Sequence, residues 1–283
     1  MEMIKNVVKG IVIGLANIIP GVSGGTLAVS MGIYDKLIHS LTHLFKEFKK
    51  SILFLLPVFL GAGIAIGGLS FVIPVLFEKF PFQTNLFFIG LILGGIPAIW
   101  KKVKGKKVNI GHILSFILFF ALVAGMAAFG GAEGKAADMS LNVWNVIKFF
   151  AVGVIASATM VIPGVSGSMV LLLLGYYNPI ITTIKTFLTA LAAFDVPVLL
   201  QCCGILIPFG IGVIVGIFAI AKLIEILLEK FPNYVYWAIL GLILASPIAI
   251  ILAGSMGVLT MVSGLTGAVT FAIGVLIAMK LGD

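Results

Sequence analysis

The sequence predicts an all-α polytopic membrane protein built from two inverted repeats, each a re-entrant helical hairpin followed by three transmembrane helices. Three observations predict this fold class. The 283 residues are 61% hydrophobic and 10% charged, whereas roughly 25% of residues are charged in an average soluble domain. Several apolar stretches reach about 20 residues, the length that crosses a bilayer core as a helix. A Gly-rich motif in the first half also returns in the second. This composition excludes a soluble globular protein.

The basic residues support a membrane location rather than nucleic-acid binding. All 18 are Lys, the chain has no Arg, and its formal net charge is +8. The lysines cluster in short loops between apolar segments, as the positive-inside rule predicts. The absence of Arg removes the fork-shaped side chain that usually binds phosphate or carboxylate in a bidentate way. Cys202 and Cys203 are adjacent within an apolar segment, and we interpret them as small core residues.

An internal duplication organises the chain. Residues 19–25 read IPGVSGG and return as IPGVSGS at residues 162–168, a shift of 143 residues. The string EKFP at residues 78–81 returns at residues 229–232, now shifted by 151 residues. Two landmarks that return in the same order indicate duplicated structural units, with a net 8 extra residues between the landmarks of the second copy. We therefore expect one integral membrane domain over residues 1–283, with a first repeat of about 1–131, an extracellular linker at 132–142 and a second repeat of about 143–283.

Each repeat begins with an apolar segment that Gly and Pro interrupt, at about residues 7–34 and 145–177. We expect each segment to enter the membrane and return to the same side, with Pro-Gly at its tip. Three uninterrupted apolar segments then follow each hairpin as crossing helices: 51–77, 83–100 and 110–131 in the first repeat, and 197–222, 234–253 and 257–279 in the second. Because three crossings separate the copies, the second repeat is inverted relative to the first.

The distribution of Lys predicts the orientation. Residues 35–50 contain four Lys, whereas the equivalent loop 178–195 contains one. With both termini in the cytoplasm, the Lys-rich loop is cytoplasmic, as the positive-inside rule requires. If both interrupted segments crossed fully, that loop would lie outside. Residues 35–50 also have apolar positions at helical spacing opposite Lys, which predicts a helix along the cytoplasmic interface.

The two tips are the predicted substrate site. Non-helical, Gly-rich backbone survives inside a membrane only where it is buried in protein or lines a wet cavity, and paired breaks of this kind indicate a transport site. Backbone N–H groups at the start of a helix attract anions. The predicted anion-binding residues are Gly21, Val22, Ser23, Gly24, Gly25 and Thr26 in the first tip and Gly164, Val165, Ser166, Gly167 and Ser168 in the second. The alternative is close helix packing through small residues.

Two further polar residues, Asn17 and Thr159, lie near the tips. They either line the site, where they would coordinate a cation or the substrate, or bond to a neighbouring helix. His39 and His43 stand four residues apart, as metal ligands on a helix can. With no third ligand near them in the sequence, we expect solvated histidines and predict no metal site. A phosphate-cleaving enzyme would need a nucleophile, an acid or base, and an Arg that binds phosphate, and the sequence does not bring these together. We therefore predict no catalytic residues and no enzyme activity.

The tip residues carry a family resemblance. The string GLANIIPGVSGGT at residues 14–26, followed by Gly32-Ile33-Tyr34, resembles the bacterial polyprenyl-phosphate (undecaprenyl phosphate) translocases, called PopT. The second tip and the following Gly175-Tyr176-Tyr177 fit as well, so the resemblance covers nearly the whole chain. It implies a protein of the bacterial cytoplasmic membrane that returns undecaprenyl phosphate, the carrier lipid of envelope synthesis, from the outer to the inner leaflet. One departure is Ser168, which stands where the first tip has Gly25.

The resemblance and the physical interpretation agree on an anionic substrate. A lipid phosphate would bind at the tips while its tail stays in the bilayer, which requires a site open sideways to lipid. The alternative is a secondary transporter of a small soluble anion or metabolite, which requires a central cavity closed to lipid. No cofactor is predicted, apart from a coupling cation, proton or sodium, because moving a negative charge inward opposes the membrane potential. Lys148, Lys5 and Lys9 either gather phosphate at the surfaces or anchor helix ends.

Overall fold

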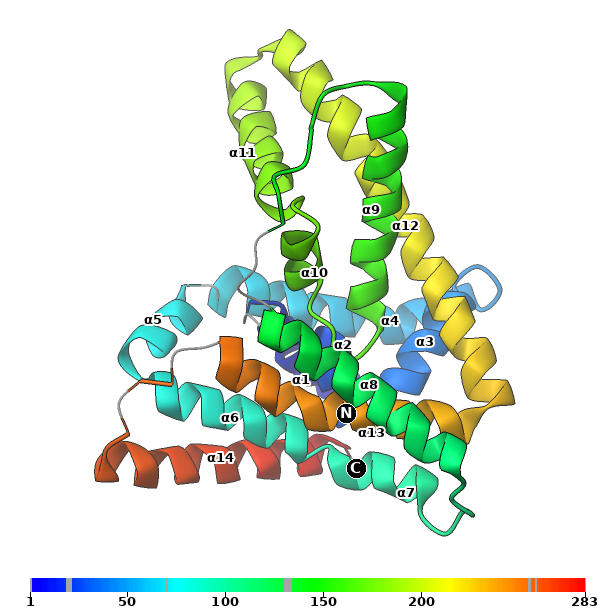
Figure 1. Cartoon of the computed structure of the whole chain (residues 1–283), viewed down its shortest axis with the longest axis vertical. Coiled ribbons are helices and arrows are strands. Elements are labelled where there is room, and N and C mark those ends of the chain that lie inside the picture. Colours follow the sequence, from blue (N-terminus) through cyan, green and yellow to red (C-terminus); the bar gives the residue numbers. More distant parts are fainter. Residues whose placement is uncertain are drawn as a thin grey trace. The chain divides into compact units, whose positions relative to one another are not determined.

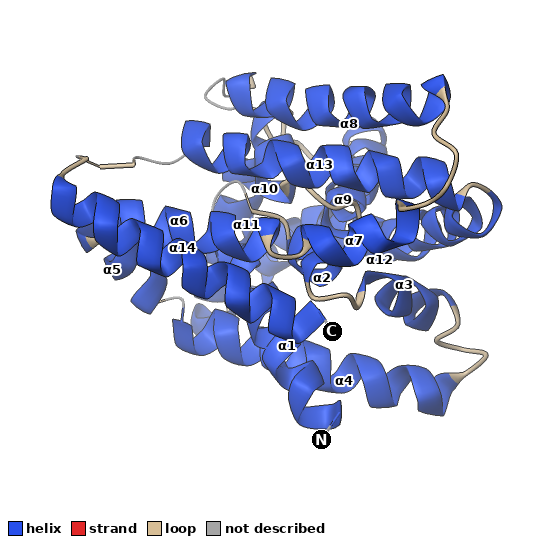
Figure 2. Cartoon of the chain, turned by 90° about the horizontal axis from the view of Figure 1, so that it is seen from below, coloured by secondary structure: helices blue, strands red, loops and turns tan. Residues whose placement is uncertain are grey.

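The computed structural model describes residues 2–18, 22–69, 71–129, 134–253, 256–257 and 259–282. All regular structure in these residues is helical (Figures 1 and 2). Among the described residues, seven helices are long and apolar enough to cross a membrane. The prediction of an all-α, multi-pass membrane protein is therefore confirmed.

The helices follow one another in the order that the duplication predicts. The first half contains α1 (Glu2–Ile18), α2 (Gly24–Ser30), α3 (Tyr34–Thr42), α4 (Phe48–Ile64), a π-helical turn η1 (Ala65–Leu69), α5 (Val72–Lys79), α6 (Pro81–Leu93), α7 (Ile96–Val103) and α8 (Ile110–Phe129). The second half contains α9 (Val143–Val161), α10 (Gly167–Leu173), α11 (Tyr177–Ala193), α12 (Val196–Lys230), α13 (Pro232–Ala253) and α14 (Met261–Gly282).

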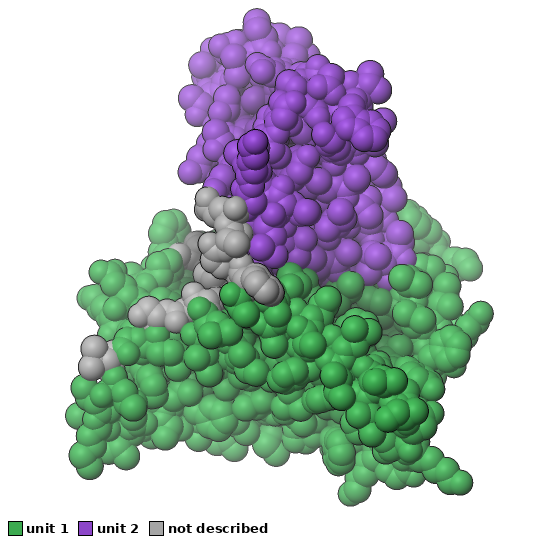
Figure 3. Space-filling model, viewed as in Figure 1, with its two compact units in different colours: residues 1–129, 162–165, 221–283 green, residues 130–161, 166–220 purple. Residues whose placement is uncertain are grey.

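The chain forms two compact units, coloured separately in Figure 3. Unit 1 comprises residues 1–129, 162–165 and 221–283, and unit 2 comprises residues 130–161 and 166–220. Unit 1 thus contains all the described helices of the first half, the short segment 162–165 of the second tip, residues 221–230 at the end of α12, and the last two helices. The described part of the linker, residues 134–142, belongs to unit 2 and has almost no regular structure.

Six of the seven candidate spans overlap the six predicted crossing segments. Two of these segments were predicted as uninterrupted and are not: 51–77 is divided among α4, η1 and α5, so that its span ends at Leu69, and 83–100 is divided between α6 and α7. The seventh is α9, which lies within the segment predicted as the second re-entrant hairpin. Its 19 residues correspond to a length of about 28 Å at 1.5 Å per residue, enough to cross a bilayer core. The next two helices, α10 and α11, are bent by 107° at the break between them. The re-entrant path of both hairpins therefore stays a prediction.

The loop between the first hairpin and α4 is less helical than predicted. One amphipathic helix was expected over residues 35–50, but α3 ends at Thr42 and α4 begins at Phe48. The Thr42 hydroxyl donates its one proton to the Glu225 carboxylate at 2.8 Å, and its oxygen also lies 3.1 and 3.0 Å from the carbonyl oxygens of Ile38 and His39. A tertiary contact with α12 therefore accompanies the end of this helix.

Matching glycines make matching helix contacts in the two halves. A Cβ at Gly10 or Gly61 would collide with a backbone carbonyl oxygen across the α1–α4 pair. The equivalent residues at the shifts of 143 and 151, Gly153 and Gly212, face carbonyl oxygens across the α9–α12 pair in the same way. Small residues allow such close approach, which is how membrane helices associate without a hydrophobic driving force. These contacts agree with a duplication, while the inverted orientation of the copies stays a prediction.

The second halves of the repeats pack on each other within unit 1. Helix α6 lies along α14, and α8 lies along α13 (Figures 1 and 2). At the shift of 151 residues, α6 corresponds to α13 and α8 to α14, since Pro81 and Pro232 begin α6 and α13. Each pair therefore joins one helix of the first repeat to one helix of the second: α6 to α14, and α8 to α13. Gly90 and its equivalent Gly241 again permit close contact with carbonyl oxygens of the partner helices.

The glycine contacts give a test with a control two residues away in the same helix. Gly61→Ala should lower the stability of the chain, because the new methyl would meet the Val7 carbonyl oxygen, an overpacking cost of about 1–3 kcal/mol. Gly63→Ala meets no atom of another element within 4 Å and should gain up to about 1 kcal/mol from helix propensity. Thermal unfolding in detergent measures both, and equal midpoints would contradict the close α1–α4 contact.

Candidate functional site

Each interrupted segment breaks where its tip motif lies. Helix α2 begins at Gly24 and α10 begins at Gly167, at equivalent positions of the duplication. The residues before them, Ser23 and Ser166, have nearly the same extended backbone, with φ, ψ of −101°, 134° and −89°, 122°. Neither hydroxyl caps its own helix. The N-cap side chains therefore accept no hydrogen bond from the first backbone N–H groups of the two short helices.

The two breaks contact each other within unit 1. The backbone N–H of Gly164 donates to Thr26 Oγ1 at 2.6 Å, and Ser23 Oγ donates to the Ile162 carbonyl oxygen at 3.5 Å. Thr26 is 0% exposed and Ser23 is 5% exposed. The first tip thus meets residues 162–165 of the second, although 138 residues separate Thr26 from Gly164. A buried backbone N–H without an acceptor would be costly, and the Thr26 oxygen is the acceptor for the Gly164 N–H.

Backbone geometry requires glycine at the contact. Gly164 has φ of +80°, in the left-handed region that side chains with a Cβ rarely adopt. A Cβ there would also lie 3.0 Å from the Leu242 Cβ of α13. Gly164 therefore lets the chain turn sharply while its N–H points at Thr26.

The rest of the second tip belongs to unit 2. Ser166 Oγ and Ser168 Oγ lie 3.0 Å apart and form a hydroxyl pair. Gly167 packs against Thr159, since a Cβ at Gly167 would lie 2.8 Å from Thr159 Oγ1. Thr159 in turn donates to the Ala156 carbonyl oxygen at 2.6 Å. This bond lies within α9 itself, so it is not the predicted bond to a neighbouring helix, and the role of Thr159 in lining the site stays a prediction.

The remaining predicted residues divide into described and undescribed ones. Val22, Gly25 and Val165 are buried, and Gly24 is partly exposed. Gly21 and the side chain of Asn17 lie outside the described residues. The described tips contain only Gly, Val, Ser and Thr, so their available polar groups are hydroxyls and backbone amides.

Two of the surface lysines have local partners. Lys9 Nζ donates to the Met31 carbonyl oxygen at 2.9 Å, at the C-terminal end of α2, where a positive charge is favourable. Lys148 Nζ lies 5.9 Å from the Trp144 ring centroid and 3.4 Å from Asn145 Oδ1. Both lysines therefore have partners within the protein, and the choice between gathering phosphate and anchoring a helix end stays open.

Sequence reasoning missed an apolar groove in unit 1. The groove has a volume of about 490 Å³ and is lined by residues of α1, η1, α5, α6 and α14. Its α1 residue is Leu15, in the last turn before the first tip. The polar lining residues are satisfied by protein groups: Thr84 donates to the Phe80 carbonyl oxygen at 2.7 Å, and Thr270 to that of Gln83 at 2.8 Å. The walls of the groove are therefore hydrocarbon.

Comparisons with known proteins identify the family. The model of the undecaprenyl phosphate translocase-like family matches residues 13–266. The chain belongs to this family. It is 31% identical to a polyprenyl-phosphate transporter of Staphylococcus aureus, over 98% of this chain and 95% of the relative. It is 30% identical to a polyprenyl-phosphate transporter of Vibrio cholerae, over 87% of this chain and 77% of the relative. No solved structure matches the chain. The family membership confirms the resemblance carried by the tip motifs.

The contact between the breaks is testable through Thr26. Thr26→Val removes the acceptor of the Gly164 N–H and keeps the shape of the side chain, so a buried donor loses its partner at a cost of about 1–3 kcal/mol. Thr26→Ser retains the hydroxyl and is the matched control. We expect a lower unfolding midpoint for the Val variant than for the Ser variant in detergent. A Val variant as stable as the Ser variant would contradict the hydrogen bond.

Proposed function

We propose that this chain transports undecaprenyl phosphate from the outer to the inner leaflet of the bacterial cytoplasmic membrane, by alternating access around the two tips. The family and the names of both relatives support a polyprenyl-phosphate substrate. One structural observation carries the mechanism: the Gly164 N–H to Thr26 hydrogen bond, which joins the two helix breaks in one place. Both relatives are transporters by name, and the tips contain no acid or base for catalysis.

The phosphate head group would bind to backbone amides and hydroxyls of the tips. Ser23, Thr26, Ser166 and Ser168 supply the hydroxyls, and Gly24 and Gly167 begin the two short helices. Such neutral donors can hold an anion without Arg, as helix N-termini do in other proteins. A neutral site also releases its ligand more readily than a site of fixed positive charges, which suits a carrier that must discharge its substrate on the opposite side.

The apolar groove favours a lipid substrate over a soluble anion. A polyprenyl tail needs hydrocarbon surroundings, and the groove of unit 1 supplies them beside the last turn of α1. Only the charged head then needs shelter from the bilayer core, where an isolated charge is very costly. A small soluble anion, the alternative substrate, has no apolar part that would bind in a hydrocarbon groove of about 490 Å³.

Burial of the first tip implies a conformational step. Thr26 is fully buried and its oxygen already accepts the Gly164 N–H. A head group that reaches these groups has to replace this contact. We therefore propose that the Thr26–Gly164 contact opens and closes during the transport cycle, which is the movement that alternating access requires at a fixed central site.

The substrate and its site can be tested together in proteoliposomes. Intact chain should speed the movement of undecaprenyl phosphate between leaflets, while Ser166→Leu should abolish this activity because the new side chain obstructs the tip. Gly63→Leu is the control, since a Cβ at Gly63 meets no atom of another element within 4 Å. All variants are first shown to be monodisperse. No movement with intact chain would point to soluble anions, and activity of Ser166→Leu would contradict the tip site.

Inward movement of a negative charge needs an energy source. It opposes an inside-negative potential by about 2.3 kcal/mol per charge per 100 mV. We propose coupling to entry of a proton or sodium ion, or to protonation of the phosphate. Transport should therefore slow when both ion gradients are collapsed by ionophores, while passive leakage in protein-free vesicles is the control. An unchanged rate would contradict the coupling.

A further inference from the structure

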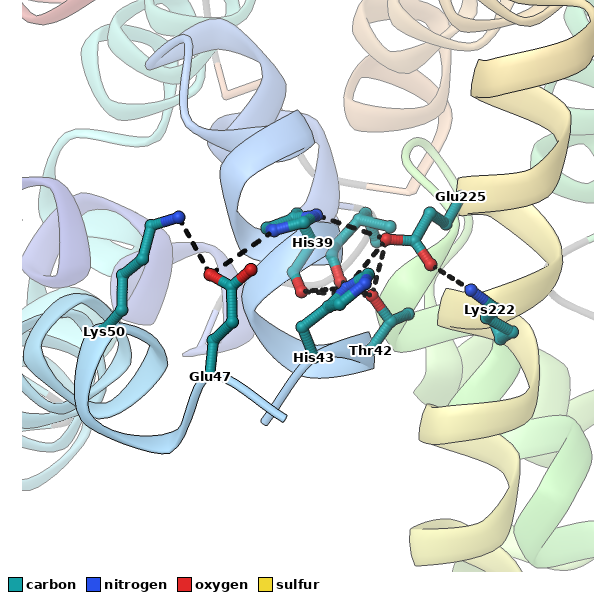
Figure 4. Close-up of polar contacts among 8 residues, drawn as sticks. His39, Thr42, His43, Glu47, Lys50, Lys222 and Glu225 are labelled. Carbon is teal, nitrogen blue, oxygen red and sulfur yellow. Dashed lines mark hydrogen bonds and ion pairs between the residues drawn. The ribbon is translucent and has the colours of Figure 1, made fainter. Parts of the chain in front are cut away.

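Two histidines that the sequence presents as solvated have a buried acidic partner. His39 lies in α3, His43 follows its last residue, and Glu225 lies in α12, all within unit 1 (Figure 4). The expectation that no third ligand stands near the histidines is wrong, because folding places Glu225 against both rings. Glu225 is only 5% exposed, on a helix that is otherwise largely apolar.

The three side chains are placed as metal ligands are. One ligand atom from each lies within 4.8 Å of the others. Glu225 Oε1 is 3.3 Å from His39 Nδ1 and 3.1 Å from His43 Nδ1. Ligand bonds of about 2.0–2.1 Å to Zn²⁺ give tetrahedral edges of about 3.3–3.4 Å. Two of the three ligand separations are therefore close to those of a tetrahedral site.

A second carboxylate lies behind one histidine. His39 Nε2, the ring nitrogen that would face away from a metal bound at Nδ1, is 4.0 Å from Glu47 Oε2. Lys50 donates to this carboxylate at 2.8 Å, and this hydrogen bond lowers the pKa of Glu47. A carboxylate that accepts a hydrogen bond from a ligating histidine fixes its ring and makes it a better ligand; at 4.0 Å, Glu47 acts here as a nearby negative charge and not as a hydrogen-bond acceptor.

The remaining groups hold Glu225 in position. Thr42 Oγ1 donates to Glu225 Oε1 at 2.8 Å, and Lys222 Nζ contacts Oε2 at 2.6 Å. The lysine thus engages the oxygen that faces away from the histidines, and it is itself 55% exposed. Oε1 has about two lone pairs: one accepts from Thr42, and the other faces the two histidine nitrogens, at 3.3 and 3.1 Å, where a metal ion would take the place of the histidine contacts.

We propose that His39, His43 and Glu225 bind a divalent transition-metal ion of the Zn²⁺ class. Two imidazole ligands favour Zn²⁺, Co²⁺ or Ni²⁺ over Ca²⁺ and Mg²⁺, which prefer oxygen. The ion joins α3, which directly follows α2 and its tip, to residues 221–230 of α12. Its binding should therefore stabilise this part of unit 1, since a ligand that binds only the folded chain raises its apparent stability.

The direct test titrates Zn²⁺ into chain that was purified without a His tag and freed of metal by a chelator. We expect one Zn²⁺ per chain and a higher thermal midpoint. His39→Ala/His43→Ala should lose both effects. Glu47→Gln, an exposed change, should weaken the affinity by about tenfold. Cys202→Ser/Cys203→Ser is the control and should bind normally. No binding by the intact chain, or unchanged binding by the double His variant, would overturn the proposal.

The spectrum of Co²⁺ bound to the unmodified chain reports which ligands hold the ion. This test needs no variant and therefore does not require that any variant folds. A visible ligand-field spectrum without sulfur charge-transfer bands is expected for nitrogen and oxygen ligands. Strong charge-transfer bands would place the ion on Cys202 and Cys203, and would overturn the assignment to the histidines.

Discussion

Interrupting a helix inside a membrane leaves backbone groups without partners, and the rest of this structure depends on how those groups are satisfied. Bilayer hydrocarbon offers no hydrogen bonds, so each exposed N–H or C=O costs several kcal/mol. Here two interruptions satisfy each other, since the Gly164 N–H of one donates to the Thr26 hydroxyl of the other. A duplicated segment supplies both partners. The same contact places Ser23 and Thr26 of the first break beside Ile162 and Gly164 of the second.

Glycine contacts hold the surrounding helices close enough for this arrangement. Gly10 and Gly61 bring α1, the helix before the first tip, against α4, and Gly153 and Gly212 bring α9 against α12. Lipid tails are as apolar as Leu, so burying apolar side chains gives membrane helices little reason to associate, and close backbone approach has to supply the attraction. The exposed Leu, Ile and Phe side chains of these helices, such as Leu60 and Phe59 of α4, are then the lipid-facing surface rather than a defect of packing.

Local signals predicted much of this molecule. Apolar length predicted six of the seven candidate spans, and the Pro-Gly-Val-Ser motifs predicted the two breaks, because these residues act on the backbone where they stand. Contacts across long separations were not predictable in the same way. Nothing near Thr26 in the sequence indicates Gly164, and nothing near His39 indicates Glu225, which is 186 residues away. The end of α3 at Thr42 was missed for a related reason: the apolar periodicity continues past it, and the Thr42 contact with Glu225 exists only in the folded chain.

The central claim is that the tips hold the phosphate of the lipid, and a structure of the chain in nanodiscs with undecaprenyl phosphate tests it most directly. We predict the phosphate within hydrogen-bonding distance of Ser23, Thr26 or Ser166, the Thr26–Gly164 contact opened, and the start of the tail in the apolar groove. A phosphate bound at surface lysines, with the tips closed as they are here, would contradict the account.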